Sequence, residues 1–428
     1  MSAISDRERI AHVVRRLSMG SHPDLVGQLS DPDTAIARAL DLAGAPAVPP
    51  AMDPPPSLQA SQPAQIATLI DWWVDQMQSS SRLVHERLTW FWHDHFATSL
   101  LKVRAPYLMR QQHVTIRAHA SGSFADLLHA VAKDPAMLLF LDGFTNTAGK
   151  VNENFGRECL ELFTVGRDSG YTQDDVVAAS RSFTGWVVNL AGTPTSSRLA
   201  SVGIAPWASG LVPNRHDRLV KTLLGRDGNF DLDGALDVIL DQPATGTFIA
   251  TKLYRTLIGR EPDATTARRL GAAFAHDYQI MGLVDAIVRD PAFTADTAVR
   301  TRVRTPVEKL VGIHQAAATG HGGTTTTPRR PAAVANVLHA ADYLPFLPPN
   351  VGGFPQGSLL LGPHDLVSTF ALLATLDVPP SPPKSVDALL ARFSLFDVSS
   401  TTRHVLEAER DPGRRFALAA MSPEFAVT

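Results

Sequence analysis

Hydrophobic residues recur at helical spacing along most of the chain. Between residues 7 and 44, Ile10, Val13, Val14 and Leu17 form one stripe, and a second stripe follows a break at residues 20–23. A longer pattern covers residues 64–99. Serine and aspartate recur just before such stretches, as residues that cap helix N-termini do. Further helices are predicted at residues 104–120, 123–133, 153–165, 173–183, 233–241, 245–259, 264–276, 280–288, 304–317, 385–393 and 401–408.

Strand patterns are sparse. The segments WVVNL and RLASVGI flank the turn-rich AGTPTSS, which predicts a small β-hairpin insert near residues 186–213. Residues 44–63 are rich in proline, which predicts an extended surface connection, and residues 319–331 predict a low-complexity loop. The early helices and those at 153–317 can share one core. We therefore expect a mostly α protein, a single large multi-helical domain over residues 1–428.

Composition supports a globular chain and limits its partners. Of the 428 residues, 44% are hydrophobic and 19% charged. A net charge of −3 provides no general attraction for nucleic acid, so no nucleic-acid partner is expected. The single cysteine, Cys159, excludes an intramolecular disulfide and zinc motifs built on several thiolates. No signal peptide and no apolar run of about 18 residues is seen, which predicts a cytoplasmic protein without a membrane span.

Aromatic and imidazole side chains alternate in LTWFWHDHF, residues 88–96. On a helix, positions two apart point about 200° away from each other, so His93 and His95 cannot face one metal while the helix stays regular. His95 falls on the stripe of Leu88, Trp92 and Phe96. If the helix ends near His95, the two imidazoles can converge as metal ligands. The alternative is a structural histidine that hydrogen-bonds a carbonyl among tryptophans.

A polar stripe marks the segment NENFGRECLELF, residues 152–163. At about 100° per residue, Asn154, Arg157, Glu158 and Glu161 share one face of a helix. Two carboxylates at i and i+3 suit a divalent metal or acid–base chemistry. The spacing does not match the Glu-x-x-His motif of di-iron helices. The alternative is a solvated face on which Arg157 screens the glutamates.

The dipeptide His216-Asp217 is a third candidate, since a neighbouring carboxylate can orient a histidine ligand. A turn histidine is the alternative. Phosphate-loop, H-E-x-x-H, G-x-S-x-G and kinase motifs are not found. Cys159 lies on an apolar helix side, which predicts a buried, unreactive thiol.

Several blocks together resemble one bacterial family. The blocks are residues 87–99, 133–143, 152–166, 171–186, 215–225, 304–312 and 348–357. In this order they resemble the domain of unknown function 1800 family over nearly the whole chain. The resemblance implies one helical unit. Members are often exported, and many are encoded beside a second uncharacterised family that is similar to the alkaline phosphatase and sulfatase superfamily. This sequence departs from the pattern in lacking an export signal, and it has GGFPQG where a Gly-Trp-Pro-x-Gly stretch is more frequent.

The resemblance implies that the three candidate segments belong together. The family pattern has matching histidines, acidic residues and an asparagine at His93, His95, Asn154, Glu158, Glu161, His216 and Asp217. We expect a buried pocket that combines His95, Glu158, Glu161 and the His216-Asp217 pair. Such a pocket needs ion pairs with Arg157 or a metal to satisfy its charges.

Three functions follow as hypotheses. The first is an enzyme, hydrolytic or oxygen-dependent, with Arg157, Glu158, Glu161 and His95 as catalytic residues. One divalent metal ion would be its cofactor, with ligands drawn from His93, His95, Glu158, Glu161, His216 and Asp217. The second is a non-catalytic binding or chaperone-like partner of the co-encoded phosphatase/sulfatase-like protein. The third is a structural scaffold.

Overall fold

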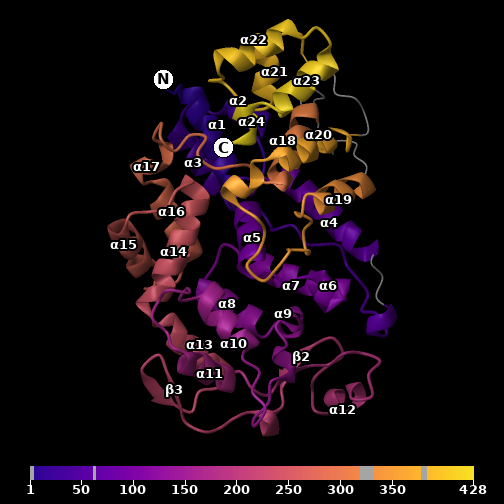
Figure 1. Cartoon of the computed structure of the whole chain (residues 1–428), viewed down its shortest axis with the longest axis vertical. Helices are drawn as coiled ribbons and strands as arrows, with labels where there is room; N and C mark the ends of the chain where they lie inside the picture. The colour runs from indigo at the N-terminus through magenta and orange to yellow at the C-terminus, as the bar shows by residue number, and fades with distance from the viewer. Residues whose placement is uncertain (1–3, 61–63, 319–330, 377–382) are drawn as a thin grey trace.

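The computed structural model describes residues 4–60, 64–318, 331–376 and 383–428 and is mostly helical (Figure 1), which confirms the predicted fold class. Of the predicted low-complexity loop, residues 319–330 lie outside the described residues. The N-terminal helices are α1 Asp6–Leu17, α2 Pro23–Gln28, α3 Pro32–Leu40, α4 Ala64–Ser79, α5 Leu83–His95, α6 Leu100–Val103, α7 Pro106–His119, α8 Phe124–Ala132 and α9 Pro135–Phe140, with 3₁₀ turns η1 Leu58–Ala60 and η2 Gly143–Thr145.

The middle of the chain contains helices and both small sheets. Its elements are α10 Asn154–Glu158, the π-helical turn η3 Cys159–Phe163, α11 Gln173–Ser182, β1 Trp186–Val188, α12 Ser196–Ser201, β2 Ser209–Leu211, the 3₁₀ turn η4 Pro213–Arg215, β3 Lys221–Leu223, β4 Arg226–Gly228, α13 Leu232–Leu240, α14 Pro243–Ile258, α15 Ala264–Phe274, α16 Ile280–Val288 and α17 Pro291–Thr294. The C-terminal elements are α18 Pro306–Ala318, α19 Pro331–Ala340, the 3₁₀ turn η5 Gly357–Leu360, α20 Pro363–Leu373, α21 Val386–Arg392, α22 Ser400–Ala408, α23 Pro412–Ala420 and α24 Pro423–Ala426.

Polar caps start many of these helices, as the sequence predicts. Ser5, Asp31, Ser123 and Asp231 each accept a backbone N–H of the first turn of the helix that follows. These bonds satisfy donors that a helix start otherwise leaves without a partner. They explain why the predicted and observed helix starts agree closely.

The predicted hairpin insert is present, but its second strand lies elsewhere. β1 pairs antiparallel with β2, with Trp186 opposite Leu211. The segment RLASVGI was expected to form the second strand, and this was wrong, because residues 196–201 form helix α12 instead. A second hairpin, β3 with β4, was not predicted.

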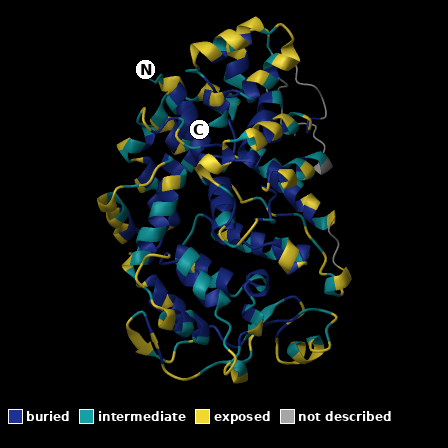
Figure 2. Cartoon of the chain, viewed as in Figure 1, coloured by how far each residue is buried: buried dark blue, intermediate teal, exposed yellow. Residues whose placement is uncertain are grey.

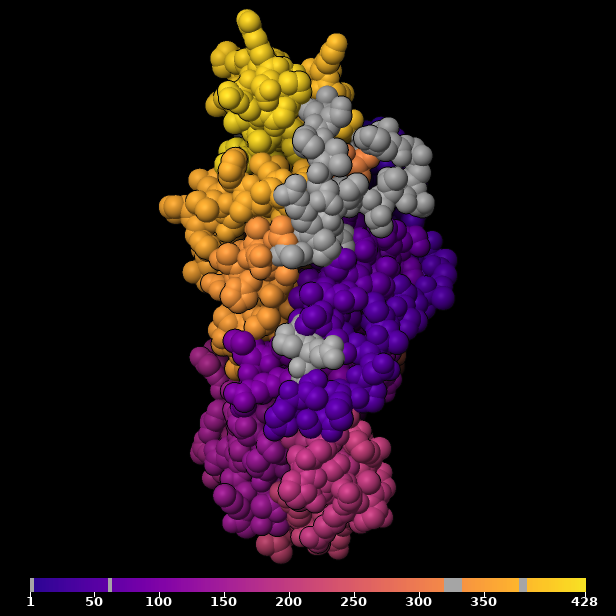
Figure 3. Space-filling view, turned by 90° about the vertical axis from the view of Figure 1, so that its right-hand side faces the viewer, coloured from indigo at the N-terminus to yellow at the C-terminus, as the bar shows by residue number. Residues whose placement is uncertain are grey.

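Helix α5 lies in the interior of the molecule (Figures 1 and 2). Every residue from Leu83 to His95 is buried except Asp94, so this helix has no solvent face. The core cluster around it includes residues from Ile10 to Phe425. The molecule is elongated (Figure 3), with the C-terminal helices at one end and the segments around β3 at the other.

Candidate functional site

The three polar residues at the C-terminal end of α5 each bind a different distant segment. His93 accepts a hydrogen bond at Nε2 from the backbone N–H of Phe346, at 3.1 Å. Its ring also packs edge-on against Trp73, at a centroid distance of 5.1 Å. Burial lowers the pKa of His93 to about 3, so the imidazole is neutral at physiological pH. Because Nε2 accepts this bond, its lone pair is already used.

His95 connects α5 to two other helical segments. Its Nε2 lies 3.0 Å from the carbonyl oxygen of Phe163, at the end of η3, and its Nδ1 lies 2.8 Å from Nζ of Lys252 in α14. A carbonyl can only accept, so Nε2 carries the proton and Nδ1 accepts from the lysine. Burial and then the charge of Lys252 lower the pKa of His95 well below its ordinary value. These contacts are those of a structural histidine, which hydrogen-bonds a carbonyl and packs among aromatic rings.

Asp94 holds the loop around residues 350–356 against the end of α5. Its carboxylate accepts the backbone N–H of Phe354 and the side-chain N–H of Gln356, both at 2.7 Å. Gly353 has φ +93°, and a Cβ atom there would lie 2.2 Å from Oδ1 of Asp94. A glycine is therefore required for this close approach. Burial raises the pKa of Asp94.

Lys252 is a polar residue of this region that the sequence analysis missed. It is partly buried in α14, and its ammonium lies 5.3 Å from the centre of the Phe248 ring. Burial lowers its pKa to about 8, although the Asp94 carboxylate nearby acts in the opposite direction. The only sequence signal was a lysine in the otherwise mainly apolar stretch TFIATKLYRTLI.

The carboxylate pair of the second motif lies where the helix changes from α to π. η3 contains one π turn, and Thr164 donates a hydrogen bond from Oγ1 to the carbonyl of Cys159. Such turns often occur at functional sites. Glu161 pairs with Arg167 and accepts a bond from the Tyr171 hydroxyl at 3.4 Å.

Glu158 is the candidate residue whose carboxylate is least satisfied. It is half-buried, and it makes no hydrogen bond or ion pair with any residue that the structure describes. Burial and then the charge of Glu161 raise its pKa. Arg157 lies near enough to lower it partly, but its guanidinium bonds Glu153 and Gln173, each at 2.9 Å.

His216 and Asp217 bind the C-terminal end of α11. Nδ1 of His216 lies 3.2 Å from Oγ1 of Thr184 and 3.1 Å from its carbonyl oxygen. Asp217 accepts a 2.7 Å bond from Nε of Arg181, and this bond lowers the pKa of the carboxyl. The two residues thus hold the segment before β3 against the end of α11.

The predicted polar residues thus form three networks in the described structure, of which the first two are joined through the bond from His95 to the Phe163 carbonyl of η3. Around α5 are His93, Asp94, His95 and Lys252; around η3 are Arg157, Glu158 and Glu161; after α11 are His216 and Asp217. Nowhere in residues 4–60, 64–318, 331–376 and 383–428 do three His, Cys, Asp or Glu side chains lie together as a metal site requires. The six proposed ligands therefore do not form one ligand set there.

An exposed apolar surface lies away from these networks, on η5 and α20. We call it the α20 face; its residues and their exposed fractions are Leu359 (80%), Leu361 (54%), Leu366 (53%), Val367 (68%) and Phe370 (62%). Large side chains this exposed on adjacent turns form a patch rather than the scattered apolar residues that surfaces ordinarily carry.

The inner side of α20 combines polar side chains with the fully buried Leu372. Its buried residues include Ser368 and Thr369, and Asp365 binds the ammonium of the buried Lys309 at 2.6 Å. Lys309 also donates to Thr369 at 3.2 Å. Between residues 356 and 376, Asp365 is the one residue of type Asp, Glu, Lys or Arg. Because it is neutralised internally, the α20 face has no unpaired formal charge.

Comparison with known proteins gives one match. The model of a family described as "Protein of unknown function (DUF1800)" matches residues 12–427. The chain belongs to this family. No curated protein and no solved structure matches it. In this DUF1800 chain, α5 ends in a block that carried the resemblance, and its polar residues bind two others, residues 152–166 and 348–357.

The described helices of this DUF1800 protein were compared with the length and hydropathy of a membrane-spanning helix. None of its helices combines the length and the apolar character needed to cross a bilayer.

Proposed function

We propose that this protein is a non-catalytic binding component that associates with a second protein through the α20 face. The observation that carries the proposal is the group of exposed apolar side chains on α20, Leu366, Val367 and Phe370. The one carboxylate of this helix, Asp365, is paired with Lys309 inside the protein. Exposed apolar area of this kind is stabilised when a partner covers it, at about 25 cal/mol per Å².

The chemistry of the surface limits the partner. An apolar face without unpaired charge provides no attraction for nucleic acid or for a highly charged protein surface. It fits an apolar, uncharged surface on another protein. The resemblance supplies a candidate, the phosphatase/sulfatase-like protein that family members have encoded beside them, and we propose this class of protein as the partner.

The polar motifs agree with a binding role. His93, His95 and Asp94 use their side chains to hold other segments of this chain, and His216 and Asp217 do the same after α11. A histidine whose two ring nitrogens are both bonded, as in His95, supports the fold without needing a substrate.

Co-expression of the tagged chain with a phosphatase/sulfatase-like protein of the proposed class tests the proposal. The test variant carries Val367→Glu and Phe370→Glu. The control carries Leu219→Glu and Val220→Glu, which change side chains that are 71% and 67% exposed directly before β3. We expect the wild type and the control to retain the partner and the α20 variant to lose it by at least about tenfold. Melting curves establish that all three are folded.

Three results would overturn the proposal. Equal retention by the α20 variant would remove this face from the interface. Failure of the wild type to retain the phosphatase/sulfatase-like protein would remove the partner. Concentration-dependent dimerisation, or flotation with neutral lipid vesicles, that is lost in the α20 variant would assign the face to a second copy or to a lipid surface.

Glu158 favours a second candidate, an acid–base enzyme. A half-buried carboxylate with a raised pKa and no hydrogen-bond partner in the described residues can exchange a proton with a substrate, and Glu161 is near enough to raise that pKa further. Arg157 would bind an anionic group only by giving up its bonds to Glu153 and Gln173. With Glu161, Glu158 also provides two oxygen ligands, which suffice for a hydrated Mg²⁺-like ion. His95 would then act only by holding the Phe163 carbonyl at the end of η3.

Elemental analysis and activity screening test this second function. Wild type, Glu158→Gln and the control Glu261→Gln, which changes a surface glutamate paired with Arg255, are compared for bound metal, for hydrolysis of nitrophenyl esters and phosphates, and for oxygen uptake. Metal or turnover that Glu158→Gln removes and Glu261→Gln retains would support the enzyme. Identical metal content and rates in all three proteins would refute it.

A further inference from the structure

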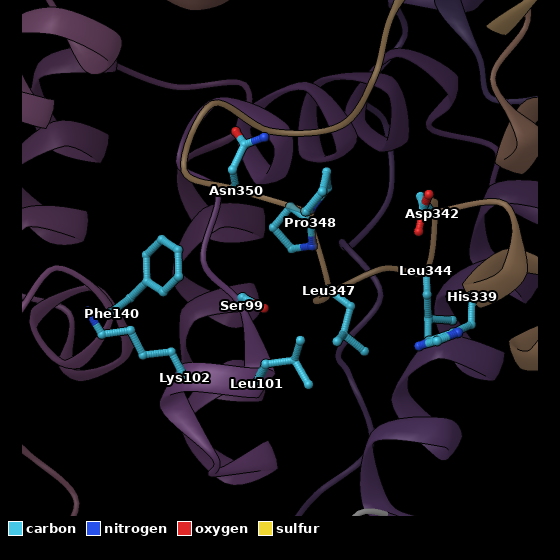
Figure 4. A pocket seen from close by; sticks show the side chains of 11 residues that line it. Ser99, Leu101, Lys102, Phe140, His339, Asp342, Leu344, Leu347, Pro348 and Asn350 are labelled. Carbon is cyan, nitrogen blue, oxygen red and sulfur yellow. The ribbon is translucent and has the colours of Figure 1, made fainter. Parts of the chain in front are cut away.

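A cavity of about 340 Å³ lies between α6 and the segment that joins α19 to η5 (Figure 4). Its lining includes no residue of the polar networks or of the α20 face. Its lining residues are Ser99, Leu101, Lys102, Phe140, His339, Asp342, Leu344, Leu347, Pro348, Pro349 and Asn350. We propose that this cavity binds a small, uncharged, mainly apolar molecule that carries one hydroxyl or carbonyl group.

The polar anchor of the proposed site is Ser99. Its side chain precedes α6, where a serine ordinarily caps the helix, yet it makes no capping hydrogen bond. The residue is only 6% exposed, and its Oγ has no hydrogen-bond partner among the described residues. A buried hydroxyl without a partner is costly, and a ligand oxygen in the cavity would satisfy it.

The charges around the cavity favour a neutral ligand. The ammonium of Lys102 is already paired with Asp142 at 2.8 Å and lies 5.8 Å from the centre of the Phe140 ring. Asp342 is exposed and would repel an anion. Apart from the polar side chains of His339 and Asn350, the remaining wall is leucine, phenylalanine and proline, which suits an apolar body.

Volume limits the size of the ligand. Liquid water occupies about 30 Å³ per molecule, so the cavity has room for roughly eleven waters or a molecule of about ten non-hydrogen atoms. The volume falls in the range of small-molecule pockets, about 300–1,000 Å³. A single substituted ring fits this space.

Backbone contacts hold the walls in place without a ligand. Leu100 donates its N–H to the carbonyl of Phe346 at 2.9 Å, and Phe346 donates its own N–H to His93. The fixed φ angles of Pro348 and Pro349 stiffen the facing wall. A preformed pocket loses little conformational entropy on binding.

Three ring compounds of similar size test the inference, namely benzyl alcohol, toluene and benzoate. Binding is measured by saturation-transfer NMR titration of the whole chain. We expect wild type to bind benzyl alcohol most tightly and benzoate least. Ser99→Ala should weaken benzyl alcohol about fivefold and leave toluene unchanged, since only the hydroxyl contact is removed. Leu347→Trp should fill the cavity and abolish binding, whereas Leu361→Trp, outside it, should not.

Contrary results are equally specific. Equal affinity of wild type and Ser99→Ala for benzyl alcohol would show that Ser99 does not bind the hydroxyl group of the ligand. Tighter binding of benzoate would contradict the charge argument, and binding retained in Leu347→Trp would locate the probes elsewhere. The absence of saturable binding of both neutral probes up to about 10 mM would remove the site. Ser99→Ala should also keep wild-type stability in urea, because the hydroxyl has no partner to lose; a clear loss would contradict the premise.

Discussion

Removing one buried carboxylate, Glu308, should strongly destabilise the protein. Glu308 in α18 is 2% exposed and binds Arg87 at 2.5 Å and Arg302 at 3.1 Å, and it accepts the backbone N–H of Thr305 at 2.8 Å. Burial alone would raise its pKa, but Arg302 and Arg87 outweigh burial and hold the pKa well below its ordinary value. The ionised form is therefore the stable one in the folded chain.

The magnitude follows from the charges left behind. Glu308→Gln preserves the shape and removes the negative charge, so the buried Arg87 and the partly buried Arg302 lose their ion-pair partner. Arg16 and Arg304, both deeply buried, are stabilised by the same carboxylate. Breaking a buried pair from one side costs about 3–5 kcal/mol, a large part of a typical folding free energy of about 5–15 kcal/mol.

Urea denaturation followed by circular dichroism measures this loss at pH 7.5. Glu261→Gln is the matched control, because Glu261 pairs with Arg255 at 3.1 Å while the two side chains are 58% and 47% exposed. Such a surface pair contributes at most about 1 kcal/mol. A loss in Glu308→Gln no larger than in the control would refute the assignment of a stabilising buried carboxylate.

The pH dependence provides a second check on Glu308. Because its folded pKa is lowered, its contribution is present above the ordinary value of 4.5 and is lost as the pH falls towards the folded value. The difference between wild type and Glu308→Gln should stay constant from pH 7.5 to about 5 and narrow below 4.5. A difference that grows with acid would contradict the sign.

Four further expectations follow from single contacts. Gly353→Ala should lower stability by about 1–3 kcal/mol in urea, since its Cβ would clash with Asp94 at a positive φ. Cys159, whose pKa burial raises to about 12, should react with a thiol reagent only after denaturation. The stability of Lys252→Met relative to wild type should be greatest near pH 7 and should fall as the pH rises from 8 towards 10.5, because over this range the folded wild type loses the buried charge that destabilises it. Glu158→Gln should melt no lower than wild type at pH 7, because its raised pKa disfavours the charged form there.

The helical periodicity allowed most of the fold to be predicted, and the reasons are local. Apolar stripes and polar caps depend on residues a few positions apart, so α1, α8 and α13 could be read from the sequence. The error at residues 196–201 has the same origin, since a short segment with mixed propensities was assigned from its apolar residues alone.

The candidate site was harder to predict because its contacts are long-range. Helical geometry left open whether His93 and His95 converge where the helix ends, and in the structure they bind different segments. What each binds depends on packing: Lys252 lies 157 positions from His95, and the Phe346 N–H lies 253 positions from His93. The π turn at η3 also leaves no signature in the pattern of apolar residues. Contacts between residues so far apart in the chain cannot be predicted from the local pattern of a single sequence.

The arrangement of the polar networks changes where function should be sought. Histidines and carboxylates in recurring blocks suggest chemistry, but here His93, Asp94 and His95 bind three segments to one buried helix, and losing any of them would loosen the fold first. A variant at these positions that loses a cellular activity would therefore say little about mechanism. The α20 face, the cavity beside Ser99 and the carboxylate of Glu158 are features that the internal contacts of the described chain leave unexplained, so substitutions there separate function from stability.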